Sequence, residues 1–462
     1  MADLSHKKRK VGPLFGIIVL DKKTNRKGTS AMAIIPNSLF SWEDDQNKLG
    51  DLERLQHILE TLPDEALMRK LEHTRGKGRD DYPIRAMWNL LIAGIVFGHN
   101  SIASLLREMN RNIQLAHVCG FGFRKYPQAH NMSRFIAILL RHETDIEEMF
   151  TKLSHSLYTL LEGFGTELAI DSKWLPSSAK WISDRKIPDG RSEVDARKGV
   201  KTYRGVREDQ TAWEKVVTCF GFKIHLLVDA VYELPIAYEV TDAAASDITE
   251  GKKMLEDLKN SRSEVLETCQ HFMGDKGYDD TILINWLKSE GVKAVIDKRS
   301  MWKAQTEKEV PGYKDAYYSE EGNVYCYTKD KGQRRMMAPN GYESGRDAVR
   351  FKCPAKAYGV KCAEMEECEC KNIRIPLSTD PRIFTQVQRE SHKWNRLYSL
   401  RTSVERVNSR LDGAYGFEEK RTRGLPRMNL HVGLALLVML AMAVWRTKNN
   451  QEEMIRSLLK TA

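Results

Sequence analysis

The segment from Arg396 to Asp412 restricts the fold more than any other, because it combines a clear helical period with one chemically unusual stripe. It lacks Pro and Gly, and its apolar residues have amphipathic-helix spacing: Leu397, Leu400, Val404, Val407 and Leu411. Tyr398, Arg401 and Glu405 would lie on one stripe of that helix. An Arg and a Glu four residues apart are most often a solvated surface pair, so the stripe alone leaves its role open.

Two strand-sized apolar runs far upstream each lead to an aspartate. The run ELAID ends at Asp171, and the run CQHFMGDKGY contains Asp275 after its apolar part. A carboxylate at the carboxyl end of a strand faces a cleft, although either aspartate alone is also explained as a cap of the next segment. The order Asp171, Asp275, Glu405 on strand, strand and helix predicts a site built from three carboxylates.

Five motifs follow one another along most of the chain, roughly from Leu52 to Trp445. They are AIDSKW around Asp171, GFKIHLLVD from Gly221, TDAAASDIT from Thr241, GDKGYDD around Asp275, and the Y-x2-R-x3-E pattern of Tyr398, Arg401 and Glu405. In this combination the chain resembles the DDE transposases of bacterial insertion sequences. The resemblance implies an α/β fold with a ribonuclease H-like mixed sheet.

The resemblance also implies cleavage of DNA at terminal inverted repeats and strand transfer into target DNA by a homodimer. Asp171, Asp275 and Glu405 would bind Mg²⁺ or Mn²⁺, because carboxylates are the hard oxygen ligands that these ions accept. Arg401 would grip a DNA phosphate, and Tyr398 would orient a phosphate or stack on a base. The alternatives are a metal-dependent nuclease without strand transfer and a domesticated DNA-binding protein.

One position departs from the family pattern. The family has a Lys seven residues after the Glu, where this chain has Asp412. Arg410 or Lys420 would have to supply that cation instead.

Composition favours a polyanionic partner. The 462 residues suffice for about two to four domains, and the net charge of +10 is spread along the chain. Residues 1–50 form a poorly patterned arm whose HKKRK run, His6 to Lys10, suits a nuclear import signal, a phosphate-binding arm or a solvated charge run. The apolar run Leu14 to Leu20 is short and lacks a cleavage site, so we expect a cytoplasmic, nucleoid-associated protein without a membrane span.

Residues 51–165 have helical periodicity and are expected to form a DNA-binding domain. Pro83 to Phe97 and Ser101 to Asn110 predict two helices joined by a short turn, which is the outline of a helix-turn-helix. Arg107 and Arg111 would face DNA from the second helix, although such hairpins are also common in proteins that bind no DNA. Ser133 to Leu161 predicts a long helical segment that leads to the first catalytic strand.

Residues 172–214 are strongly polar and predict a long loop. Its cations would border the DNA channel, namely Lys198, Lys201, Arg204 and Arg207, or the loop would be solvated and disordered.

Residues 166–298 and 386–448 are expected to form the catalytic domain. Val216 to Asp229 and Glu233 to Asp242 predict a β-hairpin. Helices and strands then alternate: Ile248 to Asn260 (helix), Phe272 to Gly274 (strand), Asp280 to Ser289 (helix) and Val292 to Ile296 (strand). Together these segments predict a mixed sheet. Leu430 to Trp445 is apolar but shorter than about 18 residues, so we expect a buried helix and not a membrane span.

Residues 299–385 read as an insertion that contains five of the eight cysteines. Small loop-rich inserts often need a metal to stay folded. The sequence therefore predicts either structural Zn²⁺ bound by Cys353, Cys362, Cys368 and Cys370 or a set of free thiols, because the spacing matches no standard zinc pattern.

Overall fold

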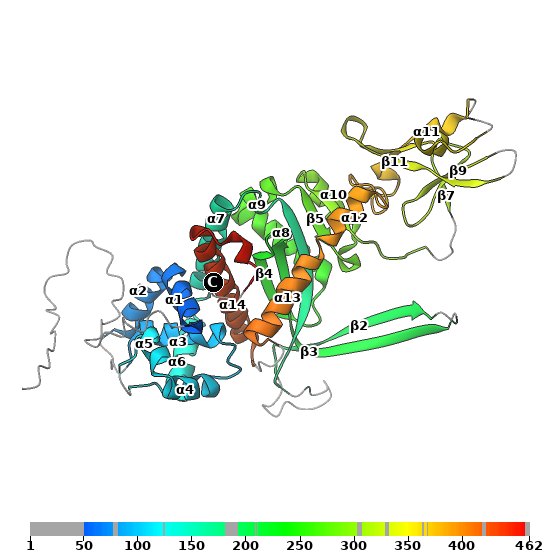
Figure 1. Ribbon diagram of the computed structural model, residues 1–462. Coiled ribbons are helices and arrows are strands. Elements are labelled where there is room, and N and C mark those ends of the chain that lie inside the picture. Colours follow the sequence, from blue (N-terminus) through cyan, green and yellow to red (C-terminus); the bar gives the residue numbers. More distant parts are fainter. Residues whose placement is uncertain are drawn as a thin grey trace, which may run out of the picture. The chain divides into compact units, whose positions relative to one another are not determined.

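A central sheet of six strands is the framework of the protein (Figure 1). Its strands are β1 (Glu167–Pro176), β2 (Arg197–Val206), β3 (Ala212–Asp229), β4 (Leu234–Asp242), β5 (His271–Gly274) and β6 (Lys293–Ile296). The strand order is β2-β3-β1-β5-β6, and β4 also pairs with β3. The pairs β1·β5 and β5·β6 are parallel and the others are antiparallel, which confirms the predicted ribonuclease H-like mixed sheet.

The computed structural model describes most of the chain. The described residues are 50–76, 82–122, 125–179, 181, 193–207, 209, 211–302, 307–328, 332–362, 365–366, 368–417 and 422–457. The HKKRK run of the N-terminal arm lies outside these ranges. All described residues belong to one unit that spans Phe40–Ala462.

The N-terminal region is helical, as predicted. Its helices are α1 (Asp51–Thr61), α2 (Glu65–Arg75), α3 (Ile84–Val96), α4 (Ile102–Arg111), α5 (Ile113–Cys119), α6 (Ala129–Leu139) and α7 (Glu143–Leu160). The predicted pair is confirmed in α3 and α4: Gly98 turns the chain with φ 61°, and the Ser101 hydroxyl caps α4 by accepting from the Ser104 N–H at 3.2 Å. The long helical segment predicted from Ser133 to Leu161 is divided into α6 and α7, because Arg141 and His142 donate to carbonyls three residues back and tighten the chain between the two helices.

The long loop predicted at residues 172–214 was also wrong. β1 continues to Pro176, and β2 pairs with the first half of β3 over ten rungs, from Arg197↔Gly221 to Val206↔Ala212. The two strands form an extended ribbon beyond the rest of the sheet (Figure 1). The polar residues misled the prediction because both faces of a two-stranded ribbon are exposed. Residues that favour strands, such as Val200 and Tyr203, therefore alternate with cations, and no regular pattern of buried side chains marks the strand.

Helices cover both faces of the sheet. They are α8 (Asp247–Ser261), α9 (Ser263–Thr268), α10 (Thr281–Ser289), α12 (His392–Ser399), α13 (Thr402–Tyr415) and α14 (Leu425–Lys448). Gly251 of α8 packs against Ile170 of β1, whereas Lys173 of β1 pairs with Asp412 of α13. Because Ile170 and Lys173 are three residues apart on a strand, α8 and α13 lie on opposite faces.

Helix α14 is the central helix of the core. It packs against α1, α3, α7 and β4, and nearly all of its residues from Val432 to Val444 are buried. Its length and apolar composition would suit a membrane span, but 83% of that apolar window is buried inside the protein. This confirms the predicted buried helix.

Between β6 and α12 the chain forms two small antiparallel sheets with a core of their own. One sheet has the order β10-β9-β8-β7 and the other β11-β12-β13. Their elements are β7 (Lys308–Glu309), β8 (Ala316–Tyr318), β9 (Val324–Tyr327), β10 (Arg334–Met336), β11 (Ala338–Glu343), β12 (Ala348–Lys352), α11 (Pro354–Tyr358) and β13 (Asn372–Pro376). Val324, Val349, Phe351 and Ile373 are among the residues that fill this separate core. We refer to residues 299–385 as the insertion.

Candidate active site

The helix predicted from Arg396 to Asp412 is divided into α12 and α13. At the junction, Leu400 and Arg401 donate to carbonyls three residues back, each at 3.0 Å, so one turn is tighter than an α-helix. The hydroxyl of Thr402 donates to the Ser399 carbonyl at 2.9 Å, which is the kind of side-chain bond that competes with helical bonding. The prediction of one uninterrupted helix was therefore wrong, although both segments are helical.

Asp171 lies inside β1 and not at its end, which corrects the prediction. The parallel pairing of β1 with β5 ends at Ala169↔Met273, so Asp171 still lies at the carboxyl end of that pair. Asp275 follows β5 directly with extended backbone angles, φ −75° and ψ 175°. Continuing the register by two residues places Asp171 opposite Asp275. The structure thus brings these two carboxylates together.

Asp171 shares a face of the sheet with α13. It precedes Lys173 by two residues on β1, so both side chains leave the strand on the same side. Lys173 pairs there with Asp412 of α13. The helix that carries Glu405 therefore covers the face from which Asp171 projects.

The charge on Asp171 is poorly compensated. Burial, and after it the neighbouring charge of Asp275, raise the pKa of Asp171 to about 6. The Ser172 N–H, which donates to Asp171 Oδ1 at 2.8 Å, and the charges of Lys201 and Arg401 lower this pKa only in part. Asp275 Oδ1 accepts the Gly277 N–H at 2.7 Å. Two adjacent carboxylates with too little positive charge around them fit a hard divalent cation.

Glu405 is not gathered with the two aspartates. Its carboxylate accepts from Arg401 at 2.6 Å and its side chain is 51% exposed. Within the described ranges, no three His, Cys, Asp or Glu side chains are grouped so that they could hold a metal ion. Arg401 lies between the two parts of the site, because it pairs with Glu405 and its charge also acts on Asp171.

The Tyr398 ring is held by its neighbours. It stacks on Trp394 with ring centroids 4.7 Å apart, and the guanidinium carbon of Arg401 lies 5.7 Å from its centroid. Burial raises the pKa of the Tyr398 phenol, so the group stays neutral near neutral pH.

A cation that sequence reasoning missed lies beside Asp412. Lys173 pairs with Asp412, and the signal for it was its position two residues after Asp171. Arg410 donates to the Glu233 carbonyl at 2.7 Å and to the Glu233 carboxylate at 3.1 Å, and its role as the replacement cation stays a prediction. Lys420 lies outside the described residues.

The two arginines predicted to meet DNA lie on the accessible side of α4. Arg107 is exposed, and Arg111 is 79% exposed while it pairs with Glu108. α3, in contrast, is buried along nearly its whole length. The pair thus presents a basic surface, and its role in DNA recognition stays a prediction.

None of the eight cysteines, all of which belong to the described residues, forms a disulfide. Of the predicted zinc ligands, Cys353 and Cys370 are buried, and the Cys370 N–H donates to Cys368 Sγ at 3.3 Å. Burial raises the pKa of Cys326 to about 11, and nearby Cys353 contributes to this rise, so Cys326 adjoins the set although the sequence did not single it out. The thiols are not gathered as a metal site, and the zinc prediction stays a prediction.

Two family models match the chain. One, described as "Transposase DDE domain", matches residues 197–441, which is more than half of the chain. The other, described as "Transposase domain (DUF772)", matches residues 40–137. The first match includes Asp275, Arg401 and Glu405, while Asp171 precedes it. A search of curated proteins found no match.

The raised pKa of Asp171 predicts a pH-dependent effect of Asp171→Asn on stability without metal. The folded-state pKa of about 6 exceeds the ordinary value of 3.8. The contribution of Asp171 to the free energy of unfolding is therefore fully present below both values and is lost as the pH rises through 6. Asn removes the charge, so at pH 8 in a chelator the variant should be more stable by about 1–3 kcal/mol, with a smaller gain at pH 5. Urea unfolding at both pH values measures this, with Asp257→Asn on the exposed side of α8 as the control. An equal gain at both pH values would contradict the assignment.

Proposed function

Because the chain belongs to the family of transposases with a DDE domain, we propose that it cuts DNA at the ends of an insertion sequence and joins them to target DNA. The observation that carries this proposal is the juxtaposition of Asp171 and Asp275 on neighbouring strands, under the helix that carries Arg401 and Glu405. Transposases act on DNA, and we place this activity in the cytoplasm, at the nucleoid.

Asp171, Asp275 and Glu405 would hold Mg²⁺ or Mn²⁺, and the donor chemistry of the two adjacent aspartates supports this. When bound, the ions would supply Lewis acidity for activating the attacking oxygen and stabilising the leaving one. Glu405 can join the aspartates only if it leaves Arg401. A DNA phosphate is the natural competitor for that guanidinium, because phosphate and carboxylate accept the same bidentate pair of hydrogen bonds. Substrate binding would then free Glu405 while Arg401 fixes the phosphate.

The cations expected at a DNA channel are carried by the β2·β3 ribbon. Lys198 is exposed on β2, and Lys201 is near enough to Asp171 for its charge to lower the pKa of that carboxyl group. Arg207 follows β2 and is exposed, and the Arg204 side chain lies outside what the structure describes. These positions support a ribbon that tracks the DNA backbone beside the scissile phosphate.

We assign recognition of the terminal inverted repeats to the helical region that contains α3 and α4. Its helix, turn, helix outline and the exposed Arg107 and Arg111 support this assignment. Two ends must be held together for strand transfer, which favours a homodimer on DNA.

Each of Asp171→Ala, Asp275→Ala and Glu405→Ala should abolish DNA cleavage and leave binding of the element ends largely intact. The reason is that each variant removes a metal ligand and not a DNA contact. Cleavage and binding of labelled end DNA, measured side by side, test this, with Glu256→Ala on the exposed side of α8 as the control. Full cleavage by any of the three variants would remove that residue from the site. Joining of a cut 3′-hydroxyl to target DNA distinguishes a transposase from a nuclease that only hydrolyses.

Arg401→Lys should lower strand transfer about 10-fold or more with metal binding unchanged. Lys keeps the charge but loses the planar fork that binds phosphate bidentately. The matched control is Arg406→Lys on the same helix, because Arg406 pairs with Glu233 at 2.7 Å and not with the site. If both variants transfer strands like the wild type, the Arg401 pair with Glu405 is only a surface ion pair.

Replacing Arg107 and Arg111 together by Ala should weaken binding to the element ends and flatten its salt dependence. Each lost phosphate contact lowers the slope of log K against log salt by about 0.9. The control is the double variant Lys253→Ala, Lys259→Ala on α8, which removes the same charge from two surface side chains that are about half exposed. A slope that is the same in both double variants would show that α4 does not contact DNA.

A further inference from the structure

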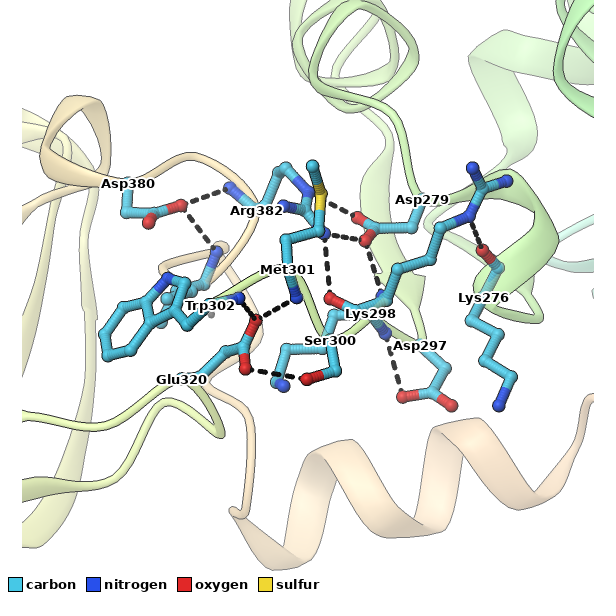
Figure 2. Close-up of polar contacts among 12 residues, drawn as sticks. Lys276, Asp279, Asp297, Lys298, Ser300, Met301, Trp302, Glu320, Asp380 and Arg382 are labelled. Carbon is cyan, nitrogen blue, oxygen red and sulfur yellow. Dashed lines mark hydrogen bonds and ion pairs between the residues drawn. The ribbon is translucent and has the colours of Figure 1, made fainter. Parts of the chain in front are cut away.

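A polar network ties the insertion to the catalytic sheet, and we call it the insertion base (Figure 2). It consists of the segment that leaves the sheet, residues 297–302, and the segment that returns to it, residues 380–390. Figure 2 shows both segments meeting at Asp279, and the outgoing segment also contacts Lys276; both residues lie just after Asp275 in the chain. The network therefore adjoins one of the proposed metal ligands.

Asp279 is the centre of the insertion base. Its side chain is fully buried, and Arg382 donates to it with two guanidinium nitrogens, Nε at 3.1 Å from Oδ1 and a second to Oδ2. The Arg299 N–H also donates to Asp279 Oδ2 at 2.7 Å. One buried carboxylate thus holds both the outgoing and the returning segment, and bidentate geometry fixes their direction.

Arg299 holds the turn that follows Asp275 from the other side. Its guanidinium donates to the carbonyls of Lys276, at 2.8 Å, and Gly277, at 2.6 Å. These carbonyls belong to the 3-10 turn Lys276–Tyr278, which the Asp275 side chain caps. A shift of the outgoing segment would therefore move the turn on which the Asp275 carboxylate rests.

The outgoing segment is in turn bound to the body of the insertion. Glu320, between β8 and β9, accepts from the Trp302 N–H at 2.9 Å and from the Ser300 hydroxyl at 3.0 Å. Figure 2 shows these contacts beside the Asp279 cluster. A displacement of the insertion would therefore also move Arg299.

The returning segment reaches α12, the helix that carries Tyr398. Arg389 is buried and donates to the Arg382 carbonyl at 3.1 and 2.7 Å, and its guanidinium carbon lies 5.8 Å from the Trp394 ring centroid. Trp394 stacks on Tyr398, which precedes Arg401 by one turn. Direct contacts thus run from the Asp275 turn to the helices that carry Tyr398 and Glu405.

We propose that the insertion base is a positioning device that sets Asp275 relative to the Tyr398 helix and makes metal binding depend on the contacts of this network. Arg299, Arg382 and Arg389 are its positioning residues. The inference rests on the proposed function in one respect, namely that Asp275 is a metal ligand. Groups that orient a ligand from behind change metal affinity strongly when they are replaced.

A second tether supplies the control. Lys288 of α10 pairs with Asp347 of the insertion, and both side chains are partly exposed, at 35% and 44%. This pair also joins the insertion to the catalytic domain, but it makes no contact with the Asp275 turn. Replacing Lys288 therefore tests the effect of loosening the insertion while the contacts of the insertion base stay in place.

The experiment measures Mn²⁺ binding to the full chain without DNA, by electron paramagnetic resonance, for Arg382→Lys, Arg299→Ala and Lys288→Ala. We expect the two arginine variants to bind Mn²⁺ about 10-fold more weakly and Lys288→Ala to bind like the wild type. Thermal unfolding of each variant checks the fold, and Arg299→Ala, at an exposed position, decides the matter if Arg382→Lys does not fold.

Unchanged Mn²⁺ binding in both arginine variants, or an equal loss in all three variants, would overturn the proposal. Mn²⁺ binding is independent of strand transfer. A wild type that binds Mn²⁺ with the expected variant pattern but joins no DNA would contradict the proposed function and leave the positioning role standing.

Discussion

The repulsion between Asp171 and Asp275 is the constraint on which the site depends. Parallel pairing of β1 with β5 places two carboxylates side by side at a partly buried edge, where burial and like charge both oppose ionisation of Asp171. The fold compensates only in part, through the Ser172 N–H, Lys201 on the ribbon and Arg401 at the start of α13. A site that keeps two acids together at such a cost is suited to a cation that arrives from outside.

Arg401 links this constraint to the third carboxylate. Its guanidinium is shared between a direct pair with Glu405 and a weaker influence on Asp171, so without substrate the Glu405 carboxylate occupies the guanidinium that the proposal assigns to a phosphate. The pairing of Lys173 with Asp412 is a second ion pair on the same face, because here too a cation is neutralised by a carboxylate of α13. The helix and the strand are thus matched in charge before any ligand binds.

Elements with a clear period could be predicted from the sequence. The helices α3 and α4, the β3·β4 hairpin and the buried α14 all follow from apolar spacing and from turn residues such as Gly98. The β2·β3 ribbon could not be predicted in this way, because a ribbon with two exposed faces has no apolar face to show. The break between α12 and α13 depends on hydrogen bonds from a side-chain hydroxyl to a backbone carbonyl, which compete with helical hydrogen bonds. The spacing of apolar residues does not show how strong this competition is.

The residue types of the candidate site could be predicted from the sequence, but the residues with which they form ion pairs could not. The order of Asp171, Asp275 and Glu405 could be read from the chain, whereas the pairs Lys173 with Asp412 and Arg410 with Glu233 join residues more than 150 positions apart. Such pairs depend on which helix covers which face of the sheet, and local sequence does not encode this.

The chain leaves the catalytic sheet between its second and third carboxylates, and this has a physical consequence. Glu405 is separated from Asp275 by an insertion with its own core, so sheet pairing cannot fix where the Tyr398 helix returns. A contact at the place where the chain leaves and re-enters the sheet must fix the position of this helix. A buried bidentate ion pair is well suited, because it tolerates only a narrow range of orientations. Asp279 and Arg382 provide this pair, and they lie where an error in the docking of the insertion would be transmitted most directly to the turn that follows Asp275.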